Sequence, residues 1–232
     1  MQQIRTILAA AEPRGDVDAL ARLVGQVEHT GADAVALLGS LTGGDGDQQA
    51  AHRALLKTLG PARVRTYWVP GPMDAPVAAY LRESYNMETV FPLLRGVHGT
   101  FALSEDYVMF AGMGGEIVDH PDAERDEQRT LRYPGWEVEY RLKVCQALSH
   151  EYPMVFLFTT VPARKGGDQP GSQVVAELIK TYNPRVALVA GGQGVRHELL
   201  GNSLVLSPGS LAEGEYALVD LHQRTVEPAK LR

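Results

Sequence analysis

The sequence predicts an α/β protein in which two packed sheets share one core and helices lie on the outside. In the first half of the chain, short apolar segments alternate with amphipathic ones, the order expected of a parallel sheet with helical crossovers. The second half repeats this order with more strand-like segments, and no linker, low-complexity stretch or internal repeat separates the two halves. We therefore expect a single domain over residues 1–232.

In the first half, three apolar runs typical of buried strands each precede a helix-like stretch. We expect the strands at residues 4–10, 34–39 and 64–69. We expect the helices at residues 16–33, 48–59 and 75–85. In the first helix, Val17, Leu20, Leu23 and Val24 recur at helical spacing, and Pro76 falls near the first turn of the third helix, where its missing N–H costs little.

The second half contains two expected helices, a hairpin and several further strands. The helices cover residues 133–149 and 172–182, and the hairpin joins 197–200 to 203–206 through a Gly-Asn turn. The remaining strands are expected at 97–103, 107–112, 154–158 and 185–191, with 215–221 as the last. Residues 112–135 form the long irregular segment, which we interpret as a mobile acidic loop or lid near a functional site. Tyr133 and Trp136 either cap a pocket there or anchor the segment.

Composition excludes several classes of function. Acidic residues outnumber basic ones by 28 to 22, a net charge of −6, which disfavours nucleic acid as a partner. The single cysteine, Cys145, excludes an internal disulfide and a zinc site built from several thiolates. No apolar run reaches the roughly 20 residues of a membrane helix, and the apolar stretch at the N-terminus is too short for a secretory signal. We therefore predict a cytoplasmic protein with no membrane partner.

Glycines and polar residues gather where the expected strands end, and ligands of α/β sheets bind at those ends. In chain order, the strand ends read EPRG at 12–15, GS at 39–40, GPMD at 71–74, TTVP at 159–162 and GGQG at 191–194. The segment SPGSLAEGEYALVDL follows at residues 207–221.

This order resembles that of the calcineurin-like metallophosphoesterase superfamily, over nearly the whole chain. Members of that family carry the following motifs in this order along the chain: D-x-H-G, GD, GNH[DE], a later histidine, GHxH, and NPGS followed by G-x-Y. The segments VPGP-DAP and GGEI make the chain similar to a small bacterial branch of the superfamily. The resemblance implies a four-layer α/β/β/α sandwich with mixed sheets, and a hydrolase fold built around two metal ions.

The residues that stand at the family's metal-binding positions differ from the family pattern. The resemblance places Glu12 and Arg14 at D-x-H, Ser40 at GD, Pro72 and Met73 at GNH, Thr159 or Thr160 at the later histidine, and Gly192 and Gly194 at GHxH. Of these, Glu12 alone remains a good metal ligand, and Met73 replaces the histidine that helps protonate the leaving group. Arg14 keeps its proton, and two unit charges about 4 Å apart repel by ~4 kcal/mol at an effective dielectric near 20. The sequence therefore predicts a degenerate site without metal or other cofactor.

Several of these residues have more than one interpretation. Glu12 and Arg14 either pair with each other or with Asp74, or Arg14 binds an anion in place of the metal charge. Asp74 is most simply the N-cap of the helix that follows it, and it is also a candidate resting partner of Arg14. His197 is interpreted as structural rather than ligating, and His52 and His98 show no pattern of partners.

Three functions follow from these observations. The favoured hypothesis is a pseudoenzyme: a non-catalytic member that binds a small anion, phosphate or nucleotide-like, or acts in an assembly. We expect its binding rim to contain Glu12, Arg14, Ser40, Pro72, Met73, Asp74, Thr159, Thr160, Gly192, Gly194 and His197, with no catalytic residue. The alternative is a phosphoesterase with an altered site that uses Glu12 and Asp74 and a single divalent metal near Glu12. A subunit of a homo-oligomer with a filled pocket is the third.

Overall fold

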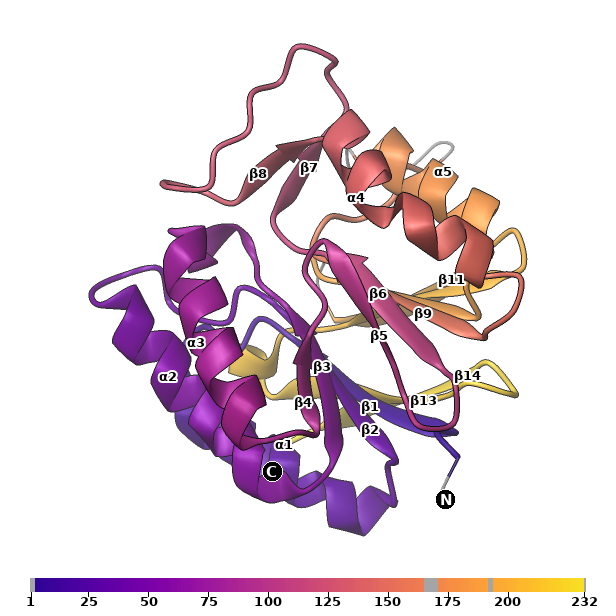
Figure 1. Ribbon diagram of the computed structural model, residues 1–232. Helices are drawn as coiled ribbons and strands as arrows, with labels where there is room; N and C mark the ends of the chain where they lie inside the picture. Colours follow the sequence, from indigo (N-terminus) through magenta and orange to yellow (C-terminus); the bar gives the residue numbers. More distant parts are fainter. Residues whose placement is uncertain (1–2, 165–170, 192–193, 232) are drawn as a thin grey trace.

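The computed structural model describes residues 3–164, 171–191 and 194–231, and Figure 1 shows two sheets between two groups of helices. The first sheet has six strands in the order β14-β13-β1-β2-β3-β4. Strands β1 to β4 run parallel, whereas β13 and β14 are antiparallel additions beside β1. Their bounds are Thr6–Ala11 (β1), Ala34–Leu38 (β2), Arg65–Val69 (β3), Leu94–Gly96 (β4), Glu215–Asp220 (β13) and Thr225–Lys230 (β14).

The second sheet also has six strands, in the order β11-β12-β10-β9-β6-β5. Its inner strands run parallel, and the edge strands β11 and β5 are antiparallel to their neighbours. Their bounds are Thr100–Leu103 (β5), Met109–Met113 (β6), Met154–Phe158 (β9), Val186–Val189 (β10), Val195–Leu200 (β11) and Ser203–Pro208 (β12). A separate parallel pair joins Glu116–Val118 (β7) to Arg132–Pro134 (β8).

Three apolar clusters define four layers. Alternate residues of each strand point to opposite faces, so Ile7 and Ala9 of β1 meet Phe110 and Leu157 of the other sheet, while Leu8 faces the helices. Helices α1 (Val17–Thr30), α2 (Gln48–Leu59) and α3 (Val77–Val90) cover the first sheet, and α4 (Gly135–Leu148) and α5 (Gln173–Tyr182) cover the second (Figure 1). The predicted four-layer α/β/β/α fold with mixed sheets is confirmed.

Local sequence explains where most helices begin and end. The side chains of Asp16, Asp47 and Ser172 accept hydrogen bonds from the first turns of α1, α2 and α5. Gly31 and Asn183 end α1 and α5 in the left-handed conformation, which these two residue types adopt readily. Within the described part of the chain, no helix is long and apolar enough to cross a membrane.

Several elements differ from the sequence-based expectation, among them β4, which was not expected. The strand at 215–221 is not the last, because β14 follows it. The third helix is longer than expected and ends at Val90, with Pro76 at its N-cap rather than in its first turn. The segment 112–135 is irregular only in part, because β7 and β8 lie within it and its apolar residues Ile117, Leu131 and Tyr133 are buried.

Candidate functional site

The carboxyl ends of β1, β2 and β3 meet at one rim of the first sheet. The backbone N–H groups of Glu12 and Arg14, after β1, donate to Leu38 and Ser40 at the end of β2, at 2.9 and 3.2 Å. Gly39, after β2, donates in turn to Val69 at the end of β3, at 2.9 Å. These cross-links extend the sheet past its strands, so the loops that carry the predicted site residues lie side by side.

Asp74 is the buried carboxylate of this rim, with 0% of its surface exposed. The backbone N–H groups of Leu41 and Gly71 donate to its Oδ2 at 2.8 and 2.6 Å, and that of Thr42 donates to Oδ1 at 2.7 Å. The Thr42 hydroxyl lies 2.9 Å from Oδ1 of Asp74. Nε2 of His52 lies 3.6 Å from the same oxygen, a distance too long for a hydrogen bond. Asp74 therefore ties the loop after β2 to the turn after β3.

This geometry corrects two expectations for Asp74. It is not the N-cap of α3, because that position belongs to Pro76, and the Asp74 carboxylate binds the loops instead. It is also not the partner of Arg14. The Arg14 guanidinium donates through Nη2 to Oε2 of Glu12 at 2.5 Å, which is the pairing with each other that the sequence left open. Arg14 is half-exposed, so an approaching anion would meet a guanidinium that Glu12 already partly neutralises.

Ser40, Pro72 and Met73 lie around the Asp74 turn, where Ser40 acts through its hydroxyl and the other two through their backbones. The Met73 N–H donates to Oγ of the buried Ser40 at 3.4 Å. The Pro72 carbonyl accepts from the N–H of Leu131, at the far end of the long segment, at 3.4 Å. The Met73 side chain is exposed, and it has no proton to transfer. The Met73 position thus offers no group for acid–base chemistry.

Thr159 and Thr160, which follow β9, bind the backbone of the loop between β6 and β7. Both hydroxyls donate to the Gly115 carbonyl, at 2.8 and 3.0 Å, and the Ile117 N–H donates to Oγ1 of Thr160 at 2.9 Å. The Gly115 N–H donates in turn to the Pro70 carbonyl at 3.1 Å. The two threonines therefore connect the second sheet to the turn after β3.

Glycine allows the loop backbones of the rim to touch. A Cβ added to Gly39 would lie 1.9 Å from the Gly71 nitrogen, and one added to Gly71 would lie 2.5 Å from the Ser40 nitrogen. A Cβ at Gly114 would lie 1.9 Å from the Pro70 oxygen. Since real Cβ atoms do not approach so closely, the absence of a side chain is what lets these loops close against one another.

The other residues predicted for the rim are Gly192, Gly194 and His197, and no hydrogen bond or strand pairing of the described ones connects them to the loops around Asp74. Gly192 lies outside the described residues. Gly194 adopts a positive φ of 72° just before β11. His197 is exposed in the middle of β11, opposite Leu206, and no hydrogen bond links it to the described rim residues.

Two histidines that the sequence analysis left without partners are buried behind the rim. His52 on α2 donates from Nδ1 to the Gln48 carbonyl at 2.7 Å. His98 accepts the Gly114 N–H at Nδ1, at 3.1 Å, so its Nε2 carries the proton and lies 3.0 Å from the Tyr133 hydroxyl. In the sequence, His98 falls within the strand expected at 97–103, which does not reveal a partner 35 residues away.

Tyr133 anchors the long segment rather than capping a pocket. Its side chain is fully buried, and the Arg141 guanidinium carbon lies 5.4 Å from its ring centroid. The first end of the segment is held by Asp119, whose carboxylate accepts from the Ser172 hydroxyl and the Gln173 N–H at the start of α5, at 2.5 and 2.6 Å. The intervening loop arches away from the body of the protein (Figure 1).

The pKa of His98 predicts a specific pH dependence of stability. Burial, with a smaller contribution from the positive charge of Arg141, lowers the pKa of His98 to about 3. The unfolded chain takes up this proton near pH 6.5, so it binds more protons than the folded chain between about pH 6.5 and 3. The stability associated with His98 is thus present above pH 6.5 and lost as the pH falls, by at most ~1.4 kcal/mol per pH unit.

We expect the free energy of unfolding, measured with urea, to depend less steeply on pH between pH 6.5 and 4 in His98→Gln than in wild type. The exposed His150→Gln variant, which leaves the buried pair intact, should keep the wild-type slope. Equal slopes in all three proteins would show that His98 is not held neutral in the folded state.

The donor set at the rim does not fit a dinuclear metal centre. Among residues 3–164, 171–191 and 194–231, no group of three or more His, Cys, Asp or Glu side chains is arranged to hold a metal ion. Threonine hydroxyls, a thioether and a guanidinium are poor or repulsive partners for divalent ions, which prefer carboxylates and imidazoles. Asp74 already accepts from three backbone N–H groups.

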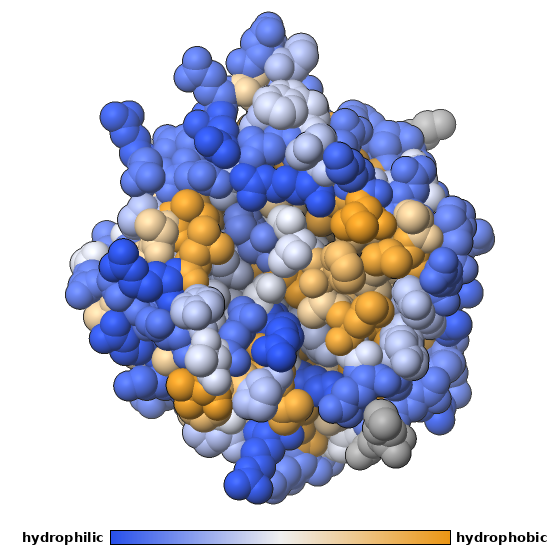
Figure 2. Space-filling model, in the orientation of Figure 1, coloured by the Kyte–Doolittle hydropathy of each residue, from blue (hydrophilic) through white to orange (hydrophobic). Residues whose placement is uncertain are grey.

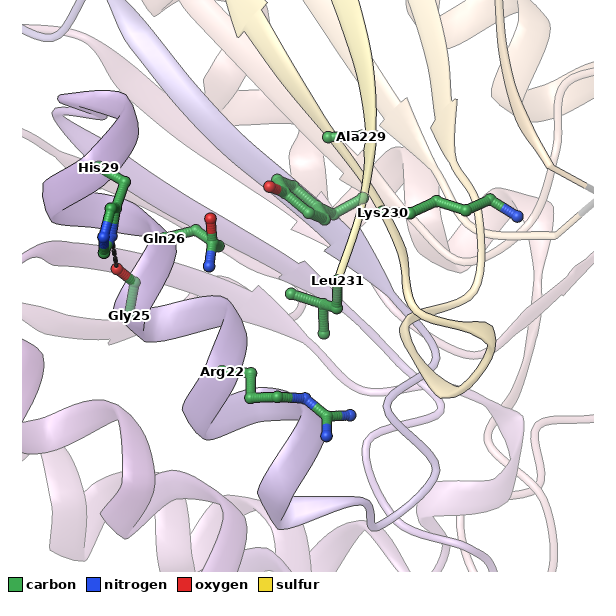
Figure 3. A pocket seen from close by; sticks show the side chains of 8 residues that line it. Arg22, Gly25, Gln26, His29, Ala229, Lys230 and Leu231 are labelled. Carbon is green, nitrogen blue, oxygen red and sulfur yellow. Dashed lines mark hydrogen bonds between the residues drawn. The ribbon is translucent and has the colours of Figure 1, made fainter.

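A cleft of about 650 Å³ lies elsewhere, between α1 and the C-terminal strands (Figure 3). Arg22 and His29 of α1 line one side, and Lys230 and Leu231 line the other. Two of its basic side chains already have partners, because His29 binds the Gly25 carbonyl at 2.8 Å and Lys230 lies 3.3 Å from Glu215. None of the predicted rim residues lines this cleft.

Solved structures with the same fold cover almost the whole chain. The protein TT1561 of Thermus thermophilus is 46% identical, with a TM-score of 0.93 over 99% of this chain and 100% of that one. A dimetal phosphatase from Danio rerio is 10% identical, with a TM-score of 0.69 over 100% of both chains. GAP50, the anchor in the inner membrane complex of Plasmodium, is 8% identical, with a TM-score of 0.59 over 98% of this chain and 88% of that one.

No curated protein sequence matches the chain. The family described as metallophosphoesterase, calcineurin superfamily, matches residues 48–231, which begin after Glu12, Arg14 and Ser40 and extend almost to the last residue. Together with the two-sheet architecture, this match assigns the family. The chain belongs to the calcineurin superfamily of metallophosphoesterases.

Proposed function

We propose that this protein is a non-catalytic, cytoplasmic member of its superfamily that binds a small anion, such as phosphate or the phosphate of a nucleotide, at Arg14. The observation that carries the proposal is the Arg14 guanidinium, half-exposed at the rim where the resemblance places a metal-binding histidine. A guanidinium keeps its charge at all ordinary pH values and offers five N–H donors in a planar fork. It can therefore replace the positive charge of a metal toward an anion without supplying an activated water.

The hydrogen bonds of Arg14 support this role. Its pairing with Glu12 uses Nη2, and this is the one side-chain hydrogen bond of Arg14 among the described residues. The other donors of the fork remain available to an anion. Because Glu12 competes for the same charge, an isolated phosphate should bind weakly, and a ligand with additional contacts to the rim should bind more tightly.

The fold by itself does not decide between catalysis and binding. The Danio rerio structure is described as a dimetal phosphatase and the Plasmodium structure as an anchor, and both share this fold at 10% and 8% identity. Function therefore has to be argued from the site. Here the site lacks a general acid at Met73, and its buried carboxylate, Asp74, is engaged by backbone N–H groups.

A phosphoesterase with an altered metal site is the second candidate. Glu12 favours it, because a carboxylate remains at the end of β1, where a single divalent ion could bind beside it. Asp74 would have to leave its three N–H donors to contribute a ligand, and His197 lies exposed on β11. These features make the binding function the better supported of the two.

The variant Glu12→Gln separates the two candidates. If Arg14 binds the anion, removing the competing carboxylate should tighten binding of phosphate or pyrophosphate about two- to fivefold, the equivalent of a half-exposed ion pair of ~0.5–1 kcal/mol. The measurement is calorimetric titration with thermal shift. Arg14→Ala should abolish the response, and Arg22→Ala, an arginine in the distant cleft, should leave it unchanged.

Two results would overturn the proposal. Manganese- or zinc-stimulated hydrolysis of phosphate esters that disappears in Glu12→Gln would establish the phosphoesterase, and elemental analysis would then find a metal ion bound to the wild-type protein. An equal anion response in wild type and Arg14→Ala would assign the Glu12–Arg14 pair a structural role alone.

A further inference from the structure

Helix α4 carries apolar side chains on both of its faces. Val138, Leu142 and Cys145 are buried against the second sheet. On the opposite face, Trp136, Tyr140 and Val144 are 60%, 65% and 46% exposed. A helix that covers a sheet normally turns a polar face to water, so this outer stripe is unusual for a surface helix.

The three exposed residues form one continuous row. Their spacing of four residues places them above one another on the same side of the helix. Strand β5, which contacts α4, adds Leu103, 42% exposed, and is an edge strand without a charged residue or a proline. Figure 2 shows a hydrophobic area over α4 and the neighbouring strands β5 and β6. Uncharged edge strands are usually covered or protected, which extends the unpartnered surface beyond the helix.

Charges flank the row in a pattern that complements itself. Glu139 and Lys143, four residues apart, are exposed on the same flank of the row, and Nζ of Lys143 lies 3.8 Å from the Tyr140 ring centroid. If a second α4 is laid antiparallel across the first near Tyr140, each Trp136 approaches the smaller Val144 of the other copy. The same arrangement sets each Glu139 toward the other copy's Lys143. The face is thus self-complementary in the antiparallel orientation, as a two-fold interface requires.

We propose that the outer face of α4, made of Trp136, Glu139, Tyr140, Lys143 and Val144, binds a second copy of this chain in an antiparallel α4–α4 dimer. The balance of charge on this face supports a copy as the partner, because two chains of net charge −6 repel unless their contact surface is locally neutral. A stable interface buries about 800 Å² on each partner, more than three side chains supply, so the β5 edge with Leu103 belongs to it.

Sedimentation velocity over a range of concentrations tests the proposal. The wild-type chain should dimerise, and Tyr140→Glu should raise the dissociation constant about tenfold or more, since it places two like charges at the centre of the contact. Tyr85→Glu is the matched control, because Tyr85 is an exposed tyrosine on the helix α3 and should leave the dimer intact. Circular dichroism melting should show that both variants remain folded.

A charge swap tests the orientation. Glu139→Lys and Lys143→Glu should each weaken the dimer about three- to tenfold, and the double variant Glu139→Lys/Lys143→Glu should restore it, because both copies then exchange signs together. A wild-type protein that is monomeric at every concentration would overturn the proposal, and so would a dimer that Tyr140→Glu leaves unchanged. A double variant as weak as the single ones would refute the antiparallel arrangement.

Discussion

Replacing Asp74 with alanine is expected to lower the free energy of unfolding by about 3–5 kcal/mol, a large fraction of the stability of a single domain. The reason is that the N–H groups of Leu41, Thr42 and Gly71 all donate to this carboxylate inside the protein. Without it, these buried donors lose their acceptor while water is excluded. Urea unfolding followed by circular dichroism measures the change.

Two further variants sharpen the test of Asp74. Asp74→Asn keeps one carbonyl oxygen as an acceptor but turns an NH₂ group toward one set of donors. Its free energy of unfolding should therefore lie between those of wild type and Asp74→Ala. Asp45→Ala, which removes an exposed carboxylate from the loop after β2, should change the free energy of unfolding by less than about 0.5 kcal/mol. A loss below about 1 kcal/mol for Asp74→Ala would mean that the loops hold their shape without the carboxylate.

Gly39→Ala is the second substitution with a large expected effect, a loss of about 3 kcal/mol or more. The new methyl group would lie 1.9 Å from the Gly71 nitrogen and 2.4 Å from the Pro70 carbonyl carbon, and these are backbone atoms that cannot rotate away as a side chain does. The loops after β2 and β3 would have to separate, which also disturbs the donors of Asp74. Thermal and urea unfolding both report the loss.

Gly25→Ala provides the matched control for Gly39→Ala. Gly25 lies in the middle of α1, and a Cβ added there meets no atom within 4 Å. Alanine should therefore stabilise the protein by about 0.5–1 kcal/mol through its higher helix propensity. If the two variants had similar stabilities, the close approach of Gly39 and Gly71 would not be a feature of the folded protein.

Both substitutions act on the same property of the rim. The turn at residues 71–74 is held from within, because backbone N–H groups donate to Asp74 and the glycines allow the loop backbones to touch. In the function proposed above, the rim would bind an anion through the groups that reach its surface, of which Arg14 carries a permanent charge.

The order of strands and helices could be predicted from the sequence because it depends on local periodicity. The apolar runs at β1, β2, β3, β9 and β10 are strands in the structure, and the order of their ends led to the superfamily that the family match then confirmed. Short edge elements were missed for a local reason as well. Strand β14 contains Pro228 and two charged residues, Glu227 and Lys230, which the pattern of a buried strand excludes but an edge strand tolerates.

The partners of the polar side chains could not be predicted from the sequence. Asp74 looks like a helix cap by its position, but its donors Leu41 and Thr42 come from a loop more than 30 residues earlier, which β2 and β3 bring beside it. His98 lies beside the end of β6, where it meets Gly114, and its other partner, Tyr133, comes from β8, 35 residues later in the chain. Local pattern determines which segments become strands and helices, whereas the packing of the two sheets decides which loops meet, and with them the partners of every buried polar group.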